Sequence, residues 1–507
     1  MAEASSRRSL RAVLAHLRWI HLAPLLALLA LSAWAFASPI GAGPDDDYHL
    51  ISTWCASGGS DHCEPGLDDN TRIVPTAFPQ VACYAQHDDR SAECQESVWG
   101  TWDHATVEIT RGNFVGEYPP VYYATMRAFA GSDVQASALV MRIVNAVLFV
   151  GLATALAALL PAARRTTLLW GWLVTLVPLG MFIIPSNNPS GWAVMGVGTA
   201  FLALLGWFET TGRRRWALAA LYLIGVIMAG GARGDAAVYV AGATVSAALI
   251  ALPATRAWWR FLWLPLLGLV LAVGLFSLAG QTGVVGSGFG ADQGFSTLPG
   301  PDGQPLGGIA LAAYNLLMLP FLWTGVWGTW ALGWFDTQLP AIVPWAAVSA
   351  FVVVAFAGLG RMNWRKAVTA TCILIVLIVL PVYVLTTGGD TVGENLQPRY
   401  LLPVIVLFAF VLLTDTTTTG LRFTRLQTFA IVGALVVANL VALQINIRRY
   451  VTGVDRQGID LDTGAEWWWT GFPVGPTAVW VIGMLAYAGL IAVLWPSLRR
   501  PTDLVTG

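Results

Sequence analysis

The sequence contains few charged residues. Only 11% of its 507 residues are charged, whereas a soluble globular chain carries roughly 25%. In contrast, 56% of the residues belong to the hydrophobic set. This excludes an intrinsically disordered chain, because disorder requires low hydrophobicity. The composition therefore indicates a polytopic membrane protein, whose first partner is the lipid bilayer.

The small net charge and the absence of two motifs exclude further classes. The formal net charge of −1 excludes a nucleic-acid-binding protein that relies on a basic surface. The sequence has no Walker-type phosphate-binding loop and no HExxH motif, which argues against an ATP-driven pump and a zinc protease. Lysine is almost absent, because Lys366 is the only one.

Long apolar runs dominate what remains. A transmembrane helix needs about 20 mostly apolar residues, and such runs predict an all-α fold of about twelve transmembrane helices in a single domain, residues 1–507. The first run lacks a convincing cleavage site, so we expect it to be retained. The predicted segments are 17–38, 135–160, 167–185, 191–208, 216–231, 236–252, 261–280, 341–359, 367–386, 400–414, 427–445 and 477–495.

Clusters of basic residues predict the orientation of the chain. Cytoplasmic loops hold an excess of Lys and Arg. Here the clusters recur after every second predicted helix and contain 18 of the 28 basic residues, so both termini are predicted to be cytoplasmic. The members are Arg7, Arg8, Arg11, Arg18, Arg164, Arg165, Arg213, Arg214, Arg215, Arg256, Arg260, Arg361, Arg365, Lys366, Arg422, Arg425, Arg499 and Arg500.

The apolar run 308–324 does not fit this topology as a further crossing. A crossing there would place the cluster around Lys366 outside the cell. We therefore predict an interfacial or re-entrant segment within a second outer loop, residues 281–340. The Trp and Phe residues of the run suit the level of the lipid headgroups.

The first outer loop is the only large hydrophilic region. It covers residues 39–118 and extends to residue 134 with a juxtamembrane helix. An even number of cysteines in an extracytoplasmic loop predicts two disulfides, although three pairings are open. The spacings Cys-x7-Cys and Cys-x10-Cys do not resemble a zinc site. The four cysteines are Cys55, Cys63, Cys83 and Cys94.

Three adjacent carboxylates, Asp45, Asp46 and Asp47, follow the first predicted helix directly. Neighbouring carboxylates repel one another, which raises the pKa of at least one of them. Such a cluster could act as a general base, bind a divalent cation or be solvated. The residues by themselves leave these three interpretations open.

Other polar residues are predicted at the outer ends of later helices. Arg233 is expected to pair with Asp235 or with a lipid phosphate, because an ionisable residue at membrane depth is a functional hypothesis. Arg399 suits a bidentate contact to phosphate, with snorkelling to the interface as the alternative. The remaining candidates for substrate contact, with turns or interfacial anchors as their structural alternatives, are Glu117, Tyr118, Asn187, Asn188, Asp336, Gln338 and Tyr400.

Five motifs carry a resemblance to a known family. The chain resembles the bacterial multi-pass membrane proteins catalogued as domain of unknown function 2142. That family usually has Glu where Asp46 stands, and Gly where Pro398 precedes the Arg-Tyr pair. The motifs are PDDDYH at 44–49, GEYPPVY at 116–122, NPSGW at 188–192, GWFDTQLP at 333–340 and PRYLLP at 398–403.

The resemblance implies a function on the outer face of the membrane. The family is similar to the C-type glycosyltransferase superfamily, whose members take a sugar from a polyprenyl-phosphate donor. It thus implies a transferase of the bacterial cell membrane that acts on a cell-envelope glycan or glycolipid. Asp45 would be the catalytic base or a metal ligand, with Asp46 beside it. Arg399, or else Arg233, would stabilise the departing phosphate, and His49 would orient a carboxylate or contact that phosphate.

Two other functions remain as alternatives. A transporter or flippase of a lipid-linked glycan predicts a polar path through the membrane and an internal repeat, and neither is convincing in this sequence. A non-catalytic envelope assembly protein predicts that the carboxylates can be lost without effect. The cofactor, if there is one, is expected to be a divalent cation.

The near-zero net charge conceals an asymmetry. Residues 39–118 contain 14 acidic and 3 basic residues, whereas the rest of the chain contains 15 acidic and 25 basic residues. The near-zero total is therefore the sum of a negative first outer loop and a positive remainder of the chain. The predicted topology places the acidic loop and the basic clusters on opposite sides of the membrane. The acidic side is where we expect the chemistry.

Overall fold

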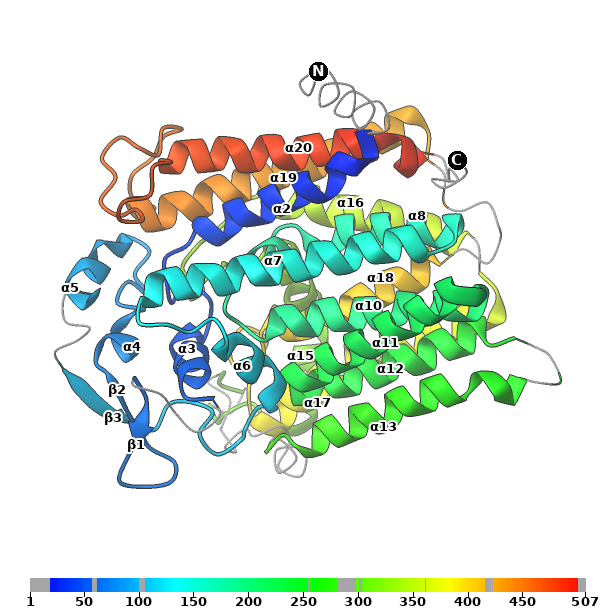
Figure 1. Cartoon of the computed structure of the whole chain (residues 1–507), viewed down its shortest axis with the longest axis horizontal. Helices are drawn as coiled ribbons and strands as arrows, with labels where there is room; N and C mark the ends of the chain where they lie inside the picture. The colour runs from blue at the N-terminus through cyan, green and yellow to red at the C-terminus, as the bar shows by residue number, and fades with distance from the viewer. Residues whose placement is uncertain are drawn as a thin grey trace, which may run out of the picture.

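The protein is a bundle of long helices with a folded loop at one end. In the computed structural model the helices run side by side, and the segment after the first of them covers the end drawn at the left of Figure 1. We call this the loop end, and the opposite end, with Arg164, Arg213 and Arg499, the basic end. The structure describes residues 19–56, 62–99, 105–253, 256, 258–280, 298–300, 303–360, 362–414, 421 and 423–499.

The helices confirm the predicted polytopic all-α fold. Among the described residues, nine helices are long and apolar enough to cross a membrane, and three further apolar helices are shorter. Eight of the nine match predicted segments: α7 (Val134–Leu159), α10 (Ser190–Glu209), α11 (Gly212–Ala232), α12 (Gly234–Ala251), α16 (Ile342–Leu359), α17 (Trp364–Gly388), α19 (Arg425–Val451) and α20 (Pro476–Arg499). The shorter helices that match are α2 (Ala23–Phe36), α13 (Trp263–Ser277) and α18 (Pro398–Leu413). The N-terminal arginines, Arg361, Arg422 and Arg500 lie outside the described residues.

The predicted segment 167–185 is two helices instead of one. α8 (Ala162–Leu176) ends before Pro178, and α9 (Leu179–Ile183) follows it. Proline has no backbone N–H and disfavours helical backbone in the residue before it. Val177 is accordingly extended, with φ −90° and ψ 126°. The interruption places the short helix α9 at the loop end, beside the acidic segment.

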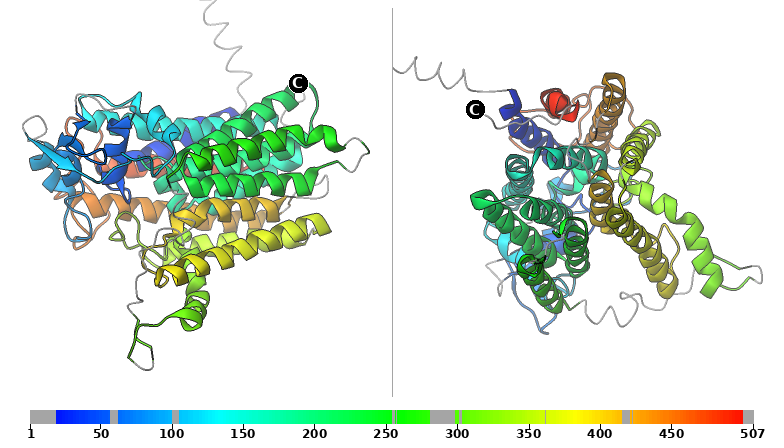
Figure 2. Two further views of the ribbon diagram at one scale, coloured as in Figure 1. Left: turned by 90° about the horizontal axis from the view of Figure 1, so that it is seen from below. Right: turned by 90° about the vertical axis from the view of Figure 1, so that its right-hand side faces the viewer.

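α15 (Gly308–Thr324) is long and apolar but runs across the bundle. Figure 2 shows it projecting sideways from the other helices. α13 ends and α16 begins at the loop end, so a single crossing by α15 would not connect them. Its location at the membrane interface stays a prediction, and residues 281–297 of the same outer loop lie outside the described residues.

The centre of the bundle is α10, whose side chains are almost all buried. α11 approaches it closely through glycine. A Cβ atom on Gly196 would lie 2.6 Å from the carbonyl oxygen of Gly225, and one on Gly225 would lie 2.8 Å from that of Gly196. Small residues allow transmembrane helices to come this close, because packing and not hydrophobicity holds helices together in lipid.

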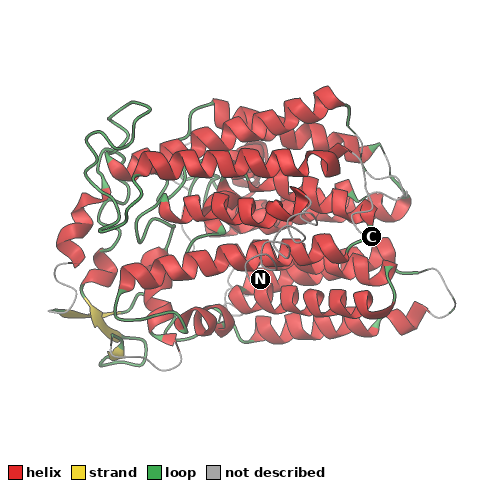
Figure 3. Cartoon of the chain, turned by 45° about the horizontal axis from the view of Figure 1, so that its top comes forward, coloured by secondary structure: helices red, strands yellow, loops and turns green. Residues whose placement is uncertain are grey.

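The first loop is a small folded unit at the loop end. It contains α3 (Asp46–Trp54), α4 (Ala77–Gln80), α5 (Gln95–Trp99) and α6 (Pro120–Arg127). A three-stranded antiparallel sheet of β1 (Glu64–Pro65), β2 (Arg72–Pro75) and β3 (Thr106–Ile109) lies at its outer margin (Figure 3). The two predicted disulfides are present, and they pair Cys55 with Cys63 and Cys83 with Cys94. Each closes a short local stretch of a unit that has little core of its own.

Candidate functional site

The acidic segment turns sharply from the end of the first helix into α3. Asp45 caps the start of α3 and has a left-handed backbone, with φ 60° and ψ 18°. The side-chain amide of Asn188 donates a hydrogen bond of 2.8 Å to the carbonyl oxygen of Pro44. Non-glycine residues rarely adopt this backbone, and such outliers gather at functional sites. The turn before α10 therefore positions the carboxylate of Asp45.

Asp45 is held between two arginines from distant parts of the chain. Arg399, at the start of α18, donates from Nη2 to Oδ2 of Asp45, and Nη2 of Arg111 lies 3.2 Å from Oδ1. Arg111 also binds both oxygens of Asp47, at 2.5 and 3.0 Å. Burial raises the pKa of the Asp45 carboxyl, but Arg399 and the other neighbouring charges more than offset this, and the pKa lies below its usual value. Asp45 is therefore ionised at neutral pH.

Asp46 has a different environment from its neighbour. Its side chain is fully buried, its Oδ2 accepts a 3.0 Å hydrogen bond from the N–H of Gly43, and Arg142 lies 3.9 Å away. The other carboxylate oxygen has no hydrogen-bond partner among the described residues. Burial raises the pKa of Asp46 to about 6, against the opposing charge of Arg142. The predicted rise in the pKa of one carboxyl is thus present, and its main cause is burial.

His49 makes a hydrogen bond to a tyrosine and, among the described residues, none to a carboxylate. Its ring is buried, and its Nδ1 lies 2.8 Å from the hydroxyl of Tyr123. Tyr48 and Tyr118 pack edge-on against the same ring. Burial lowers the pKa of His49 to about 3, although the charge of Asp45 acts in the opposite direction. The imidazole is neutral at physiological pH and holds α3 against α6.

A row of cations and rings extends the site from Asp45. Arg399 donates a 2.8 Å hydrogen bond to the hydroxyl of Tyr400, and its guanidinium lies 4.8 Å from the centre of that ring. Arg233 lies 4.6 Å from the same ring and 5.5 Å from that of Tyr118. It also makes the predicted pair with Asp235, with contacts of 2.9 and 3.0 Å. The sequence candidates Asp45, Arg399 and Arg233 therefore converge.

Arg399 retains unused hydrogen-bonding capacity. Its side chain is only 3% exposed, yet its Nε and Nη1 have no partner in the described part of the chain. Oε1 of Gln397 is also buried without one. Both residues line a hollow of about 20 Å³ together with Pro44, residues of α9 and Trp330. A buried donor without a partner is costly, so this guanidinium is suited to an anionic ligand.

Other sequence candidates have different surroundings. Asp336 accepts a 2.8 Å hydrogen bond from Arg449 at the end of α19 and another of 3.0 Å from the N–H of Gln86. Gln338 is exposed. Glu117 is exposed and accepts a hydrogen bond of 2.8 Å from the hydroxyl of Tyr48. Among the described residues, Arg399 makes no hydrogen bond or ion pair with any of these three.

Asn187 and Asn188, which adjoin in sequence, behave differently. Asn188 supports the acidic segment, as described above. The side chain of Asn187 is buried, and neither its oxygen nor its nitrogen has a partner among the residues that are described.

Two arginines of the site were missed in the sequence. Arg142 is buried in α7 and donates to the carbonyl oxygens of Ala35, Ser38 and Pro39, at 3.0, 2.6 and 2.8 Å. It is the only charged residue in that 26-residue helix, which was a usable signal. Arg111 lies in a polar loop, and nothing in its local sequence distinguishes it.

The two carboxylates are poorly suited to a divalent cation. Asp45 is flanked by Arg399 and Arg111, and Asp46 faces Arg142. These three guanidinium charges oppose a cation at either position. Within the described residues, no group of three or more His, Cys, Asp or Glu side chains could hold a metal ion. We therefore assign no chemistry to a metal at this site.

Comparison with known families agrees with the motifs. A family model described as "Predicted membrane protein (DUF2142)" matches residues 28–408. The chain belongs to this family. The matched range contains both Asp45 and Arg399, whereas Arg449 lies beyond it. No curated protein and no solved structure matches the chain.

Proposed function

We propose that this DUF2142 protein is a membrane glycosyltransferase that moves a sugar from a polyprenyl-phosphate donor to a cell-envelope glycan or glycolipid. One observation carries the proposal. A buried guanidinium with two unpartnered nitrogens, Nε and Nη1 of Arg399, lies against a carboxylate whose side chain is 34% exposed, that of Asp45. An acceptor can reach the carboxylate, and in the proposal donor binding widens the hollow of about 20 Å³ beside the guanidinium, so that a phosphate satisfies its unused donors.

The proposed reaction is a direct displacement at the anomeric carbon. The oxygen of an acceptor hydroxyl attacks this carbon and forms the new glycosidic bond. The proton of the hydroxyl passes to the carboxylate of Asp45. The bond between the anomeric carbon and the phosphate oxygen breaks, and the phosphate leaves with the electron pair beside Arg399. Besides the donor and the acceptor, the reaction needs no co-reactant, and nothing is oxidised or reduced.

Donor binding has a second role in this scheme. Without a ligand, Arg399 and Arg111 both bind Asp45 and lower its pKa, which makes it a weak base. A phosphate beside Arg399 competes with Asp45 for the guanidinium charge. Asp45 then regains basicity when the donor is present, so the donor should bind before the acceptor. Asp46 is too deeply buried to touch a substrate, and it serves to position the segment.

The location of the site is consistent with a reaction outside the cytoplasm. The site lies at the loop end of the bundle, and the described basic clusters lie at the basic end. Because cytoplasmic loops of membrane proteins hold an excess of Lys and Arg, the basic end is the one expected in the cytoplasm. The first loop, with its disulfides, belongs to an oxidising compartment. We accordingly place the protein in the bacterial cell membrane, with both termini cytoplasmic.

A transfer assay tests the proposal. The purified full chain is placed in proteoliposomes with a panel of polyprenyl-phosphate hexoses and pentoses, and transfer to an envelope fraction is measured. Asp45→Asn should abolish most of the transfer, and Arg399→Lys should weaken it. Arg456→Gln is the control, since it breaks an exposed ion pair with Glu466. A wild-type chain without transfer from any donor, or full transfer by Asp45→Asn, contradicts the proposal.

A further inference from the structure

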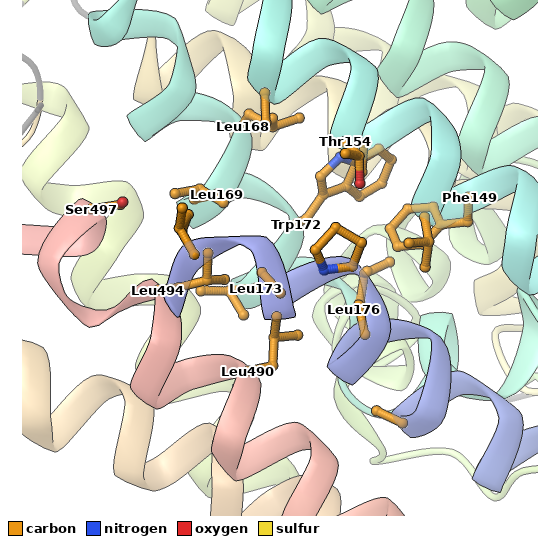
Figure 4. A pocket seen from close by; sticks show the side chains of 18 of the residues that line it. Phe149, Thr154, Leu168, Leu169, Trp172, Leu173, Leu176, Leu490, Leu494 and Ser497 are labelled. Carbon is orange, nitrogen blue, oxygen red and sulfur yellow. The ribbon is translucent and has the colours of Figure 1, made fainter. Parts of the chain in front are cut away.

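A second hollow lies within the membrane-spanning region, away from Asp45. It is a groove of about 370 Å³ between α2, α7, α8 and α20 (Figure 4). Leu169, Leu173, Leu490 and Leu494 surround it. Its volume and its mostly apolar lining are those of small-molecule sites, which range over about 300–1,000 Å³. A groove this apolar, within the bilayer, suits a hydrocarbon chain.

Three polar residues of the groove lie at its basic end. Arg165 is in the first turn of α8, Ser497 is near the end of α20, and His21 precedes α2. Arg165 carries a permanent positive charge. No described residue that lines the groove is acidic. The electrostatic environment at this end therefore favours an anionic group.

Two residues that line the groove carry a hydrogen-bond donor without a partner among the described residues. The indole N–H of Trp172 and the hydroxyl of Tyr487 are buried and find no acceptor in the described parts of the chain. Trp172 is seven positions after Arg165, about 10 Å further along α8. A buried polar group without a partner destabilises the protein unless a ligand supplies one. Both donors have almost no accessible surface, so the choice of ligand rests on the apolar lining and on the positive charge of Arg165.

We propose that the groove binds an anionic glycerophospholipid. Its phosphate lies at Arg165 and His21, and an acyl chain lies against the alanines of α7. This site is independent of the proposed glycosyl transfer. The groove reaches α9 only at Met181, whereas Leu179, Phe182 and Ile183 line the hollow of Arg399 on another side of that helix.

Lipid retention by native mass spectrometry tests this site. The full chain in detergent is mixed with phosphatidylglycerol, with phosphatidylcholine or with undecaprenyl phosphate. Phosphatidylglycerol should be retained about tenfold more than phosphatidylcholine. Equal retention of the two lipids overturns the proposal. Displacement of phosphatidylglycerol by equimolar undecaprenyl phosphate also overturns it, because the groove would then prefer an isoprenoid lipid.

Matched variants on α7 locate the bound lipid. Ala157 lines the groove, whereas Ala155, two positions earlier, does not. Ala157→Phe should lower retention of phosphatidylglycerol about tenfold, and Ala155→Phe should retain it as the wild type does. Ala153→Phe fills the same groove and serves if Ala157→Phe does not fold. Wild-type retention by a folded groove variant contradicts the assignment.

Discussion

Two Asp–Arg pairs at the loop end differ in one respect. Asp45 with Arg399, and Asp336 with Arg449, each join residues far apart in sequence. The side chain of Asp45 is 34% exposed, whereas that of Asp336 is 3% exposed and that of Arg449 is fully buried. Arg449 also donates to the carbonyl oxygens of Tyr84 and Arg90. The first pair is open to a ligand, and the second fastens the first loop to the bundle.

The comparison shows why charge alone is a poor guide to function. On sequence grounds Asp45 was a candidate catalytic residue and Asp336 a candidate for substrate contact. A buried pair is costly to break, because one charge is then left without a partner in a medium of low dielectric constant. A partly exposed pair can exchange one member for a ligand. The two pairs should therefore respond to equivalent substitutions in different measurements.

The largest expected effect is on catalysis at the open pair. Asp45→Asn removes the proposed base but keeps the size of the side chain. Transfer should fall by about 10²- to 10⁴-fold, while the thermal midpoint in detergent should fall less than that of Asp336→Asn, because water reaches the partly exposed position 45. Undiminished transfer would show that this carboxylate is not the base.

The closed pair should respond in stability instead. Asp336→Asn leaves the charge of Arg449 buried and unpaired, which is expected to cost about 3–5 kcal/mol of unfolding free energy. Thermal unfolding of the detergent-solubilised chain measures this. The rate of sugar transfer per folded molecule should equal that of the wild type. A loss of transfer without a loss of stability would instead place Asp336 in the site.

Asp46 should make stability depend on pH. Its pKa is about 6 in the folded protein, against 3.8 for an aspartate in the unfolded chain. Between pH 4 and 6 the unfolded chain has released this proton while the folded protein still holds it, so the folded state loses stability as the pH rises. The loss approaches about 3 kcal/mol.

Comparison with a variant isolates this contribution. Asp46→Asn cannot ionise, so its stability advantage over the wild type should grow from pH 4 to pH 6 and then level off. Subtracting the stability of the wild type from that of the variant at each pH removes the contribution of His49, which both proteins share. That contribution has the opposite sign, because the lowered pKa of His49 costs stability as the pH falls below 6.5. A difference that does not change with pH would show that Asp46 is ionised throughout.

The smallest expected effect concerns the contact between Arg399 and the donor phosphate. Arg399→Lys retains a positive charge near Asp45 but loses the planar fork with the unused N–H groups. Transfer should fall about tenfold, mainly through a higher KM for the donor, because the contact to phosphate is weakened. An unchanged KM for the donor would argue against a phosphate at this position.

Local sequence predicted the features that depend on local physics. Long apolar runs predicted the helices, and an even number of cysteines in a hydrophilic loop predicted the two disulfides. The motifs predicted the family, which the match over residues 28–408 shows. The break at Pro178 was also a local signal, but the apolar run around it concealed the division into α8 and α9.

Tertiary structure decided which charges meet. Arg399 and Asp45 are 354 positions apart, and Arg449 and Asp336 are 113 apart. No local pattern distinguishes these two pairs, or shows that Arg142 faces Asp46. The same holds for the different pKa shifts of the adjacent residues Asp45 and Asp46, since burial and neighbouring charge depend on what packs around each carboxylate.

The sequence by itself thus determined that this is a polytopic helical membrane protein with an acidic, disulfide-containing first loop. It could do so because hydrophobicity and charge act on each segment separately. Only the tertiary structure separated Asp45, which is open and held by two arginines, from Asp46 and Asp336, which are enclosed. That difference arises from solvent access and from partners distant in sequence, which exist only once the helices have packed.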